Sequence, residues 1–390
     1  MPPQSHSQKS LHSDDTDNLM EEEEYHDDVG SVSTHDSDAA PFKADIVWRN
    51  VVLFVILHLG ALYGMYMLMF AKAKFFTYIW VVALHIFGGL GITGGAHRLW
   101  SHRTYKATWP LRVFLIFCNS IALQNDVIEW SRDHRVHHRF SETDADPHNA
   151  KRGLFFSHMG WLMMKKHPDV KRKGASVDMS DLWADPLLRF QRRYYLPIAI
   201  LCCFVVPTVV PGLLWGESYW VAYFTAGLFR YCFTLHATWT VNSLAHMFGH
   251  RPYDKTINPR QNMTSVWMTL GEGWHNYHHT FPFDYRASEY PWRVNLTTMF
   301  IDGFCALGLA YGRREVTPEM IERRKLKTGD GTELYSRRAP PASPIPSQEG
   351  VLGTSAPEFK KCHVKSRSLT CDPMVLGAAA ATLGAAVKYD

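Results

Sequence analysis

Eight histidines fall into three tight clusters whose spacing suits the binding of metal ions. The clusters are the strings HRLWSH (97–102), HRVHH (134–138) and HNYHH (275–279). Residues three and four apart share one face of an α-helix, so each of the last two clusters is expected to offer its imidazoles to one small volume. His97 and His102 lie about 140° apart around an α-helix. These two side chains therefore either serve two different metal ions or lie where the helix end unwinds.

A ninth candidate, His246 in the string VNSLAH, brings the set to more imidazoles than one metal ion takes. Neutral imidazole is the commonest metal ligand, and first-row ions bind it readily. A structural zinc ion takes four ligands, so nine imidazoles fit two ions. Two ions held only by nitrogen also differ from the soluble carboxylate-bridged di-iron arrangement with its Glu-x-x-His pairs. The candidate ligands are His97, His102, His134, His137, His138, His246, His275, His278 and His279.

The remaining histidines and the acidic residues near the clusters receive simpler interpretations. Ordinary surface or helix-end positions are expected for His6, His12, His26, His35, His148, His158, His167 and His363. A carboxylate near a cluster is a candidate to accept the second N–H of a ligating imidazole and fix its tautomer, with plain surface charge as the alternative. These candidates are Asp133, Glu142, Asp144, Asp146 and Glu272.

Four apolar stretches are expected to hold these clusters against a membrane. They cover about residues 51–70, 75–95, 195–215 and 219–241. Twenty residues of α-helix cover about 30 Å, the thickness of a bilayer core. The fourth stretch carries Arg230, which is costly in lipid, so its face is expected to look into protein or water. The alternative is a core of buried soluble helices.

Charge gives the orientation of these spans. Residues 97–194 contain 17 Lys and Arg against 10 Asp and Glu, which by the positive-inside rule predicts a cytosolic block. Four spans then leave both termini in the cytosol, with the catalytic parts at 96–194 and 242–330. The apolar stretch 111–124 is too short to span and is expected to lie on the membrane or to pack in the cytosolic part.

The domain organisation follows from composition. Residues 1–44 are acidic and poor in apolar side chains, and residues 331–390 are rich in Pro, Ser and Gly, so both are expected to be disordered tails around one membrane domain at 45–330. A net charge of +4 is too small to predict a nucleic-acid surface. Seven cysteines without a C-x-x-C argue against a disulfide scaffold or a zinc site built from thiolates.

The strings GAHRLWSH, EWSRDHRVHH, FSETDADPHN, VNSLAH and GEGWHNYHHTFPFDY resemble the membrane-bound fatty acyl-CoA desaturases of animals, the stearoyl-CoA Δ9 desaturase group. The resemblance covers roughly residues 46–331. It implies an all-α integral membrane protein of the endoplasmic reticulum, in which four transmembrane helices in two hairpins are capped by a helical cytosolic di-iron domain.

The resemblance also implies the reaction and its participants. Two Fe2+ ions and O2 would insert a cis double bond, at Δ9, into a saturated long-chain fatty acyl-CoA such as palmitoyl- or stearoyl-CoA. Breaking an unactivated C–H bond needs a metal-bound oxidant, because no amino-acid acid or base does this at neutral pH. The chain has no His-Pro-Gly-Gly haem-binding string. Two electrons are therefore expected from a separate cytochrome b5 and, indirectly, its NADH-dependent reductase.

Further site residues are carried over from the resemblance alone. Asn242 would be a weak metal ligand. The acyl chain would run along Gln124, Trp130, Thr238 and Trp239, and its length would be set at His85 and Gly89. Polar and charged side chains would surround the CoA end, although the two lysines among them also suit anionic lipid headgroups. These are Asn50, Asn125, Arg132, Asp133, Lys165 and Lys166.

Two departures from the family pattern leave the double-bond position and the chain length open. Trp274 stands where the family more often has Phe, and Ile128 where an aromatic residue is common. Three alternatives therefore stand beside the Δ9 desaturase: a desaturase of other regiochemistry, a membrane di-iron fatty acyl hydroxylase, and an inactive lipid-binding membrane relative.

Overall fold

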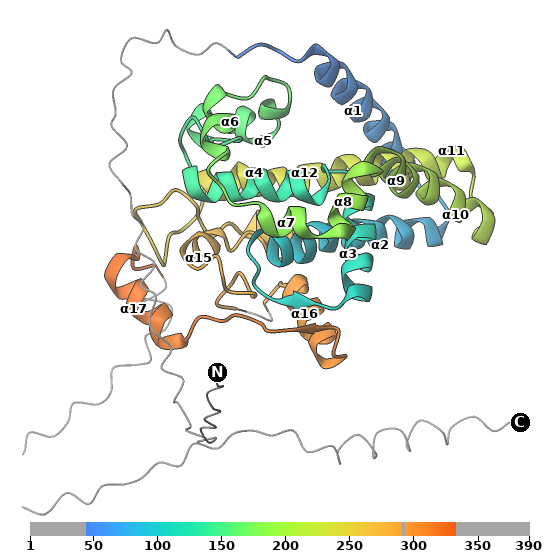
Figure 1. Cartoon of the computed structure of the whole chain (residues 1–390). Coiled ribbons are helices and arrows are strands. Elements are labelled where there is room, and N and C mark those ends of the chain that lie inside the picture. The colour runs from blue at the N-terminus through green and yellow to red at the C-terminus, as the bar shows by residue number, and fades with distance from the viewer. Residues whose placement is uncertain (1–43, 291–292, 333–390) are drawn as a thin grey trace, which may run out of the picture. The chain divides into compact units, whose positions relative to one another are not determined.

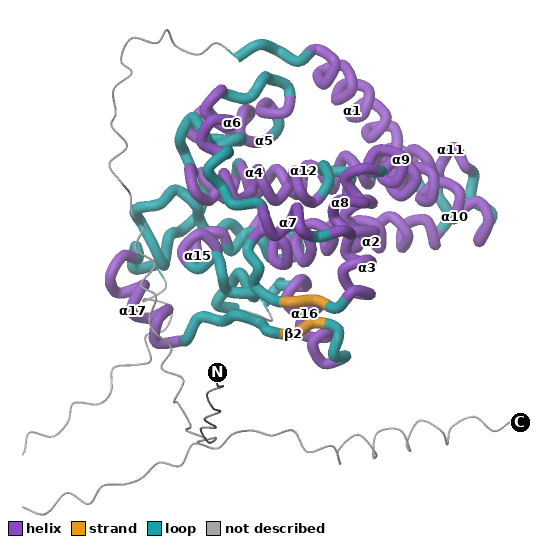
Figure 2. Tube along the Cα trace, viewed as in Figure 1, coloured by secondary structure: helices purple, strands orange, loops and turns teal. Residues whose placement is uncertain are grey.

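Helices make up almost all the regular structure of the protein in this computed structural model, which describes residues 44–290 and 293–332 (Figure 2). The only strands in these ranges are β1 (Lys106–Ala107) and β2 (Ala310–Tyr311), which pair antiparallel. The mostly helical class predicted from the sequence is confirmed. The expectations for the tails 1–44 and 331–390 lie almost wholly outside the described residues, as do His6, His12, His26, His35 and His363.

The described helices follow one another along the chain, with longer connections before α14 and before α16 (Figure 1). Three of them, η1, η4 and η5, are π-helical and continue the α-helices beside them, and η2 and η3 are short 3-10 turns. In chain order they are α1 (Trp48–Met69), α2 (Phe75–Leu90), η1 (Gly91–Ser101), α3 (Trp109–Ala122), α4 (Val127–Phe140), η2 (Ala150–Arg152), α5 (Leu154–His158), η3 (Gly160–Leu162), α6 (Pro168–Gly174), α7 (Ser180–Ala184), α8 (Pro186–Arg193), α9 (Tyr195–Ile200), η4 (Leu201–Val205), α10 (Val206–Trp215), α11 (Tyr219–Ala222), η5 (Tyr223–Phe229), α12 (Arg230–Asn242), α13 (Leu244–Met247), α14 (Met263–Met268), α15 (His275–Thr280), α16 (Leu296–Ala306) and α17 (Pro318–Thr328).

Three helical segments are long and apolar enough to cross a membrane. They are Trp48–Met69, Phe75–Ser101 and Tyr195–Trp215, with 22, 27 and 21 residues. The second and third contain the predicted spans 75–95 and 195–215, and the first covers all of 51–70 except Phe70. The fourth predicted span is helical too, from α11 through η5 into α12, but it does not pass the same test of length and composition. Helices α3 and α4 pass that test only together, and they are bent by 81° at the break between them.

Arg230, in the middle of the fourth predicted span, is fully buried in protein. Its guanidinium donates to the backbone carbonyl oxygens of Ile121 at 2.9 Å, Cys203 at 2.6 Å and Ala226 at 3.1 Å. Ile121 lies near the C-terminal end of α3, where carbonyl groups lack partners within the helix. The expectation that the Arg230 face looks into protein is confirmed.

Glycines allow the helices to approach one another closely at two crossings. A Cβ atom at Gly91 would lie 2.1 Å from the backbone nitrogen of Asn119, and one at Gly64 would lie 2.0 Å from the carbonyl oxygen of Phe224. Any other side chain at these two positions would force the helices apart. The close contact with α3 fixes η1, which carries the first histidine cluster.

Candidate metal centre

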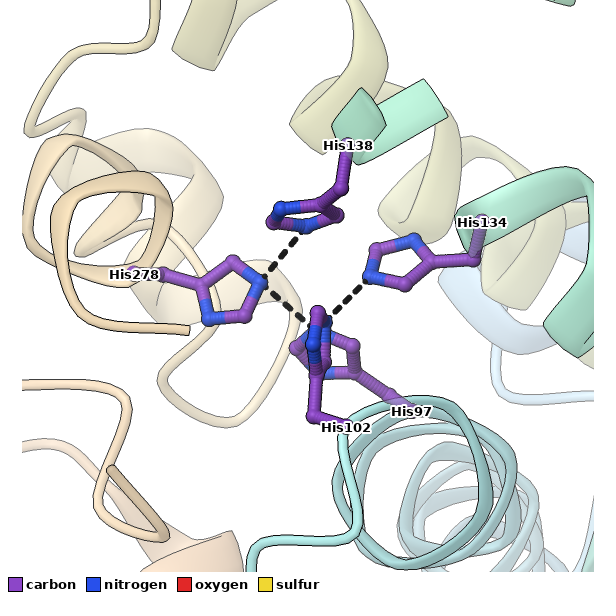
Figure 3. A group of neighbouring side chains, drawn as sticks. All are labelled: His97, His102, His134, His138 and His278. Atoms are coloured by element: carbon purple, nitrogen blue, oxygen red, sulfur yellow. Dashed lines mark hydrogen bonds between the residues drawn. The ribbon is translucent and has the colours of Figure 1, made fainter. Parts of the chain in front are cut away.

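The nine predicted histidine ligands come together in two adjacent groups. Each group consists of imidazoles whose nearest ring nitrogens all lie within 4.8 Å of one another. Figure 3 shows the first group, in which rings from three separate segments point at one another. The first group is His97, His102, His134, His138 and His278, and the second group is His137, His246, His275 and His279.

The two groups are assembled from four segments of the chain. His97 lies in η1 and His102 directly after it, α4 carries His134, His137 and His138, and α13 and α15 carry the rest. Asp126 caps the N-terminus of α4 by accepting the backbone N–H of Glu129 at 3.2 Å, and Arg192 donates to the same carboxylate at 2.8 Å. This anchored start sets the rotation of α4, and with it the directions of its histidines.

The expectation that each His-x-x-His-His cluster serves one small volume is wrong. In α4, His134 and His138 belong to the first group while His137 belongs to the second. In α15 the division is reversed, because His278 joins the first group and the other two histidines join the second. At about 100° per residue, positions i and i+4 are about 40° apart whereas i+3 lies about 60° away on the other side. Each helix therefore gives a pair to one group and a single ring to the other.

His97 and His102 lie in the same group because the helix that carries them is π-helical. The backbone N–H of His102 donates to the carbonyl oxygen of His97 at 3.1 Å, an i to i+5 hydrogen bond. In this wider turn, residues five apart lie nearly above one another. Their ring centroids are 4.9 Å apart. The 140° separation expected for an α-helix does not occur.

Within both groups the imidazoles meet through their Nε2 atoms. His97 faces His278 at 3.0 Å, His102 faces His134 at 2.8 Å, and in the second group His246 faces His275 at 3.0 Å. Such a convergence of nitrogens is the arrangement that metal ligands adopt, since each Nε2 can turn its lone pair to a common centre.

Three of the five candidate carboxylates lie against the outer ring nitrogen of a histidine. Glu272 lies 3.0 Å from Nδ1 of His97. In the same way Nδ1 of His137 lies 3.0 Å from Asp146, and Nδ1 of His246 lies 2.8 Å from Glu142. Each contact places the proton on Nδ1 and leaves Nε2 free for a metal ion. Of the other two candidates, Asp133 pairs with Arg132 and Lys166 instead, and Asp144 is exposed without a histidine contact.

Arg98 supports the first of these carboxylates and was missed by the sequence reasoning. Its buried guanidinium donates to Glu272 at 2.6 and 3.0 Å, and to the backbone carbonyl oxygen of Tyr285 at 2.9 Å. Burial alone would raise the pKa of Glu272, but the charge of Arg98, with the contacts to Arg98 and His97, lowers that pKa to about 2. The carboxylate is therefore ionised at every physiological pH. Arg98 lies inside the first histidine string, and this position could have marked it as part of the site.

Burial keeps most of these imidazoles neutral. It lowers the pKa of the ring far below its ordinary value, and the neighbouring rings of the two groups lower that pKa further. The neutral imidazole is the form whose lone pair binds metal. The histidines with this large shift are His102, His134, His138, His275, His278 and His279.

A cavity of about 490 Å³ adjoins both groups. His97 and His275 line it, together with Trp130, Thr238 and Asn242 from the predicted set. A second cavity, of about 250 Å³, is lined by His85 and Gly89. The two cavities share Ile92, Thr93, Thr238 and Thr269, so they adjoin each other and are together called the path.

The other predicted tunnel residues lie beside this path or behind it. The side-chain amide of Gln124 donates to the hydroxyl of Thr238 at 3.0 Å, which places it next to a cavity-lining residue. Trp239 lines neither cavity and packs with Leu57, Leu235 and their neighbours. Trp274 and Ile128, the two departures from the family pattern, are buried but line neither cavity.

Most residues predicted at the CoA end form one connected set. The start of α1 lies beside residues 162–166, where Asn50 donates to the carbonyl oxygen of Leu162 at 2.7 Å. Lys166 pairs with Asp133 of α4, which also pairs with the neighbouring Arg132 at 2.9 Å. Lys165 pairs with Asp45 at 2.9 Å. Asn125 has a positive φ of 74° and stands apart from this set.

One of the three described histidines expected at surface or helix-end positions has another environment. His148 is buried, with its ring 4.4 Å from that of His137 and its Nδ1 3.5 Å from Asp146. His158 is half-buried and hydrogen-bonds to both His236 and Ser243. His158 is the last residue of α5 and His167 caps α6, so both are at helix ends as expected. His148 lies in a loop, so no helical periodicity marks it in the sequence.

Comparison with known proteins agrees with this geometry. The model of the fatty acid desaturase family matches residues 77–293. The chain is 57% identical over 307 residues to the stearoyl-CoA desaturase of Bos taurus, covering 79% of this chain and 85% of the relative. It is also 57% identical over 289 residues to a Delta(9)-fatty-acid desaturase of Caenorhabditis elegans, covering 74% and 85%. An acyl-CoA Delta-9 desaturase of Acheta domesticus is 57% identical over 293 residues, 75% of this chain and 81% of that protein.

Proposed function

The chain belongs to the fatty acid desaturase family, and on that premise we propose that it inserts a cis double bond at Δ9 into saturated long-chain fatty acyl-CoA. The observation that carries the proposal is the path of two cavities that starts at the histidine groups and ends at Gly89. An extended acyl chain fits such a path, with the carbon to be oxidised beside the histidines. By their names, the Bos taurus relative acts on stearoyl-CoA and the Acheta domesticus relative on acyl-CoA.

The two histidine groups fit two iron ions. Their donors are neutral imidazoles whose tautomers are fixed in three cases by buried carboxylates. Asn242 lines the cavity next to His275 and is proposed as a weak ligand of the second group, which has one histidine fewer. When bound, the iron pair would supply the oxidising chemistry with O2 that breaks the two C–H bonds.

The protein itself positions the chain and excludes water. Trp130 and Ile92 give the first cavity apolar walls, while the hydroxyl of Thr238 is engaged by Gln124. Satisfied polar groups cost little when an alkyl chain replaces water beside them. Beyond them, Gly89 leaves room at the far end, where Leu270 closes the second cavity. Trp239, which packs with Leu57 and Leu235, is proposed to hold the helix that carries Thr238 in place.

The polyanionic CoA end is proposed to bind where α1 meets residues 162–166. Lys165, Lys166 and Arg132 supply the positive charge there, and Asn50 and Asn125 supply amide groups. Asp133 holds Lys166 and Arg132 together. Its pairing spaces the two cations so that phosphate groups can bind both.

We further propose four membrane spans, with 219–241 as the fourth, in the endoplasmic reticulum membrane. Both termini and the helical cap with the metal centre would face the cytosol, where a separate cytochrome b5 and its NADH-dependent reductase deliver two electrons. The basic block 97–194 supports this orientation.

Expression in a yeast lacking its own Δ9 desaturase tests the proposal. The yeast should grow without added oleate, and mass spectrometry of its fatty acids should locate a new cis double bond at Δ9. The His138→Ala variant serves as the inactive control. A hydroxylated chain without an alkene would support the hydroxylase instead, and purified protein without iron or product would support an inactive lipid-binding relative.

A further inference from the structure

A third convergence of ligand atoms lies outside the two histidine groups. His58 of α1 and His236 of α12 approach each other through Nε2 at 3.0 Å, and Cys232 precedes His236 by one turn of the same helix. One ligand atom from each of the three side chains lies within 4.8 Å of the others. The approach of the two rings repeats the Nε2-to-Nε2 contacts of the proposed iron ligands, which range from 2.8 to 3.3 Å.

The outer nitrogens of this pair are already engaged, which fixes their tautomers. Nδ1 of His58 lies 2.6 Å from the carbonyl oxygen of Phe54. A carbonyl only accepts, so Nδ1 carries the ring proton and Nε2 presents its lone pair. The same pattern, with an outer N–H on a backbone carbonyl, orients histidines that bind metal.

A chain of hydrogen bonds fixes the tautomer of His236, with its proton on Nδ1. The hydroxyl of Ser243 donates to the carbonyl oxygen of Trp239 at 2.7 Å, so its oxygen accepts from Nδ1 of His158 at 2.9 Å. Nε2 of His158 then accepts Nδ1–H of His236 at 2.9 Å. These bonds use every ring proton of three neutral histidines. The Nε2 atoms of His58 and His236 are therefore both left with lone pairs that face each other.

Two facing lone pairs repel unless a cation lies between them. The surroundings are apolar, since Cys232 packs with Leu57, Ala61 and Leu235. His58 is also the only acidic, basic or histidine side chain in residues 51–70. Such groups are costly at membrane depth and usually serve a specific site.

We propose that His58, Cys232 and His236 form a third metal site, which binds a soft or borderline cation, Zn2+ or Cu+. A thiolate with two imidazoles suits these ions, whereas the proposed iron ligands include no sulfur. The thiolate also supplies one negative charge, which balances Cu+ and offsets half the charge of Zn2+ in an apolar setting. The ion would join α1 to α12, which otherwise meet through apolar side chains here.

The test uses the full-length protein purified with its iron. Co2+, which replaces Zn2+, is added and the near-ultraviolet spectrum is recorded for a thiolate-to-cobalt band. One equivalent of Co2+ should bind with this band, and metal analysis after Zn2+ addition should find one equivalent of Zn2+ beyond the iron. Neither readout requires desaturase activity, so a failure here leaves the proposed function untouched.

Two variants and a matched control complete the test. Cys232→Ser should abolish the band, and His236→Asn should lower Co2+ and Zn2+ affinity at least about tenfold, because it removes Nε2 but keeps a polar atom for His158. Cys202→Ser changes a helix cysteine that belongs to none of the ligand groups in the described chain, and should retain the band. Unchanged iron content in all three shows that they fold. Wild-type protein that binds neither Co2+, Zn2+ nor Cu+ beyond its iron, or a band that survives in Cys232→Ser, would overturn the proposal in favour of a shared proton.

Discussion

The imidazole rings of His138 and His279 lie face to face, with centroids 4.1 Å apart and planes 11° from parallel, although they belong to different ligand groups. His138 turns its Nε2 to His278 at 3.0 Å in the first group. His279 turns its Nε2 to His275 at 3.1 Å in the second. The stacked pair is therefore the shared wall of the two groups, and damage to either ring is expected to disturb both.

His138→Ala should abolish desaturation and lower the iron content while the protein stays in the membrane. Loss of an outer partner of a metal ligand costs about 10- to 100-fold, so loss of the ligand itself should cost more than about 100-fold in activity. Product analysis and iron quantification on purified protein check this. His250→Ala, at an exposed histidine outside both groups, is the control. Full activity in His138→Ala would refute its assignment as a ligand.

Glu272→Gln should lower iron affinity and activity about 10- to 100-fold, because the amide removes the charge that orients His97 and pairs with Arg98. The pKa of Glu272 is depressed to about 2, so its stabilising effect is complete above the unfolded pKa of about 4.3 and is lost only as the pH falls toward 2. The loss in the variant should therefore be the same at pH 6 and at pH 8. Activity assays at both pH values test this, with the exposed Asp144→Asn as control. A defect that disappears at one of these pH values would contradict the ion-pair role.

Gly89→Phe should shift the product profile toward shorter acyl chains, since the ring would fill the second cavity against Leu270. The ratio of stearoyl- to palmitoyl-derived product should fall about tenfold or more. Gly303→Phe adds the same side chain where nothing lies within 4 Å of the new Cβ, and should leave the profile unchanged. If both variants keep the wild-type chain length, Gly89 does not line the end of the tunnel.

Arg230→Met should destabilise the protein by about 3 kcal/mol or more, because three buried carbonyl groups lose their donor. In detergent the thermal unfolding temperature should fall by about 5 °C or more. Arg189→Met, at an exposed arginine, should change it little. An unchanged unfolding temperature for Arg230→Met would show that water replaces the guanidinium.

The sequence predicted which histidines form the centre but not how they divide. Spacing of three and four residues identifies a helix face, yet the division between His137 and its neighbours depends on where a second helix lies. The pairing of His97 with His102 depends on a π-helical turn, and no residue type in 91–101 marks such a turn reliably. Three carboxylate partners were found because they lie near the clusters in sequence.

Contacts between segments far apart in the chain could not be predicted either, because they too depend on where a second helix lies. The length of the apolar stretches identified three of the candidate spans. Arg230 stood out as a charged residue in the fourth stretch, which predicted that its side chain faces protein or water. His58 and His236 are 178 residues apart, and each looked like an isolated residue in an apolar stretch. Only the crossing of α1 with α12 brings them together.

The reversed division of histidines between α4 and α15 has a consequence for assembly of the centre. Because each helix contributes to both groups, filling one group fixes the rotation of the helices that must complete the other. With both groups filled as proposed, the first ion to bind is expected to prepare the second site in advance. A cell short of iron should then contain mainly fully loaded and empty molecules, with few that carry a single ion.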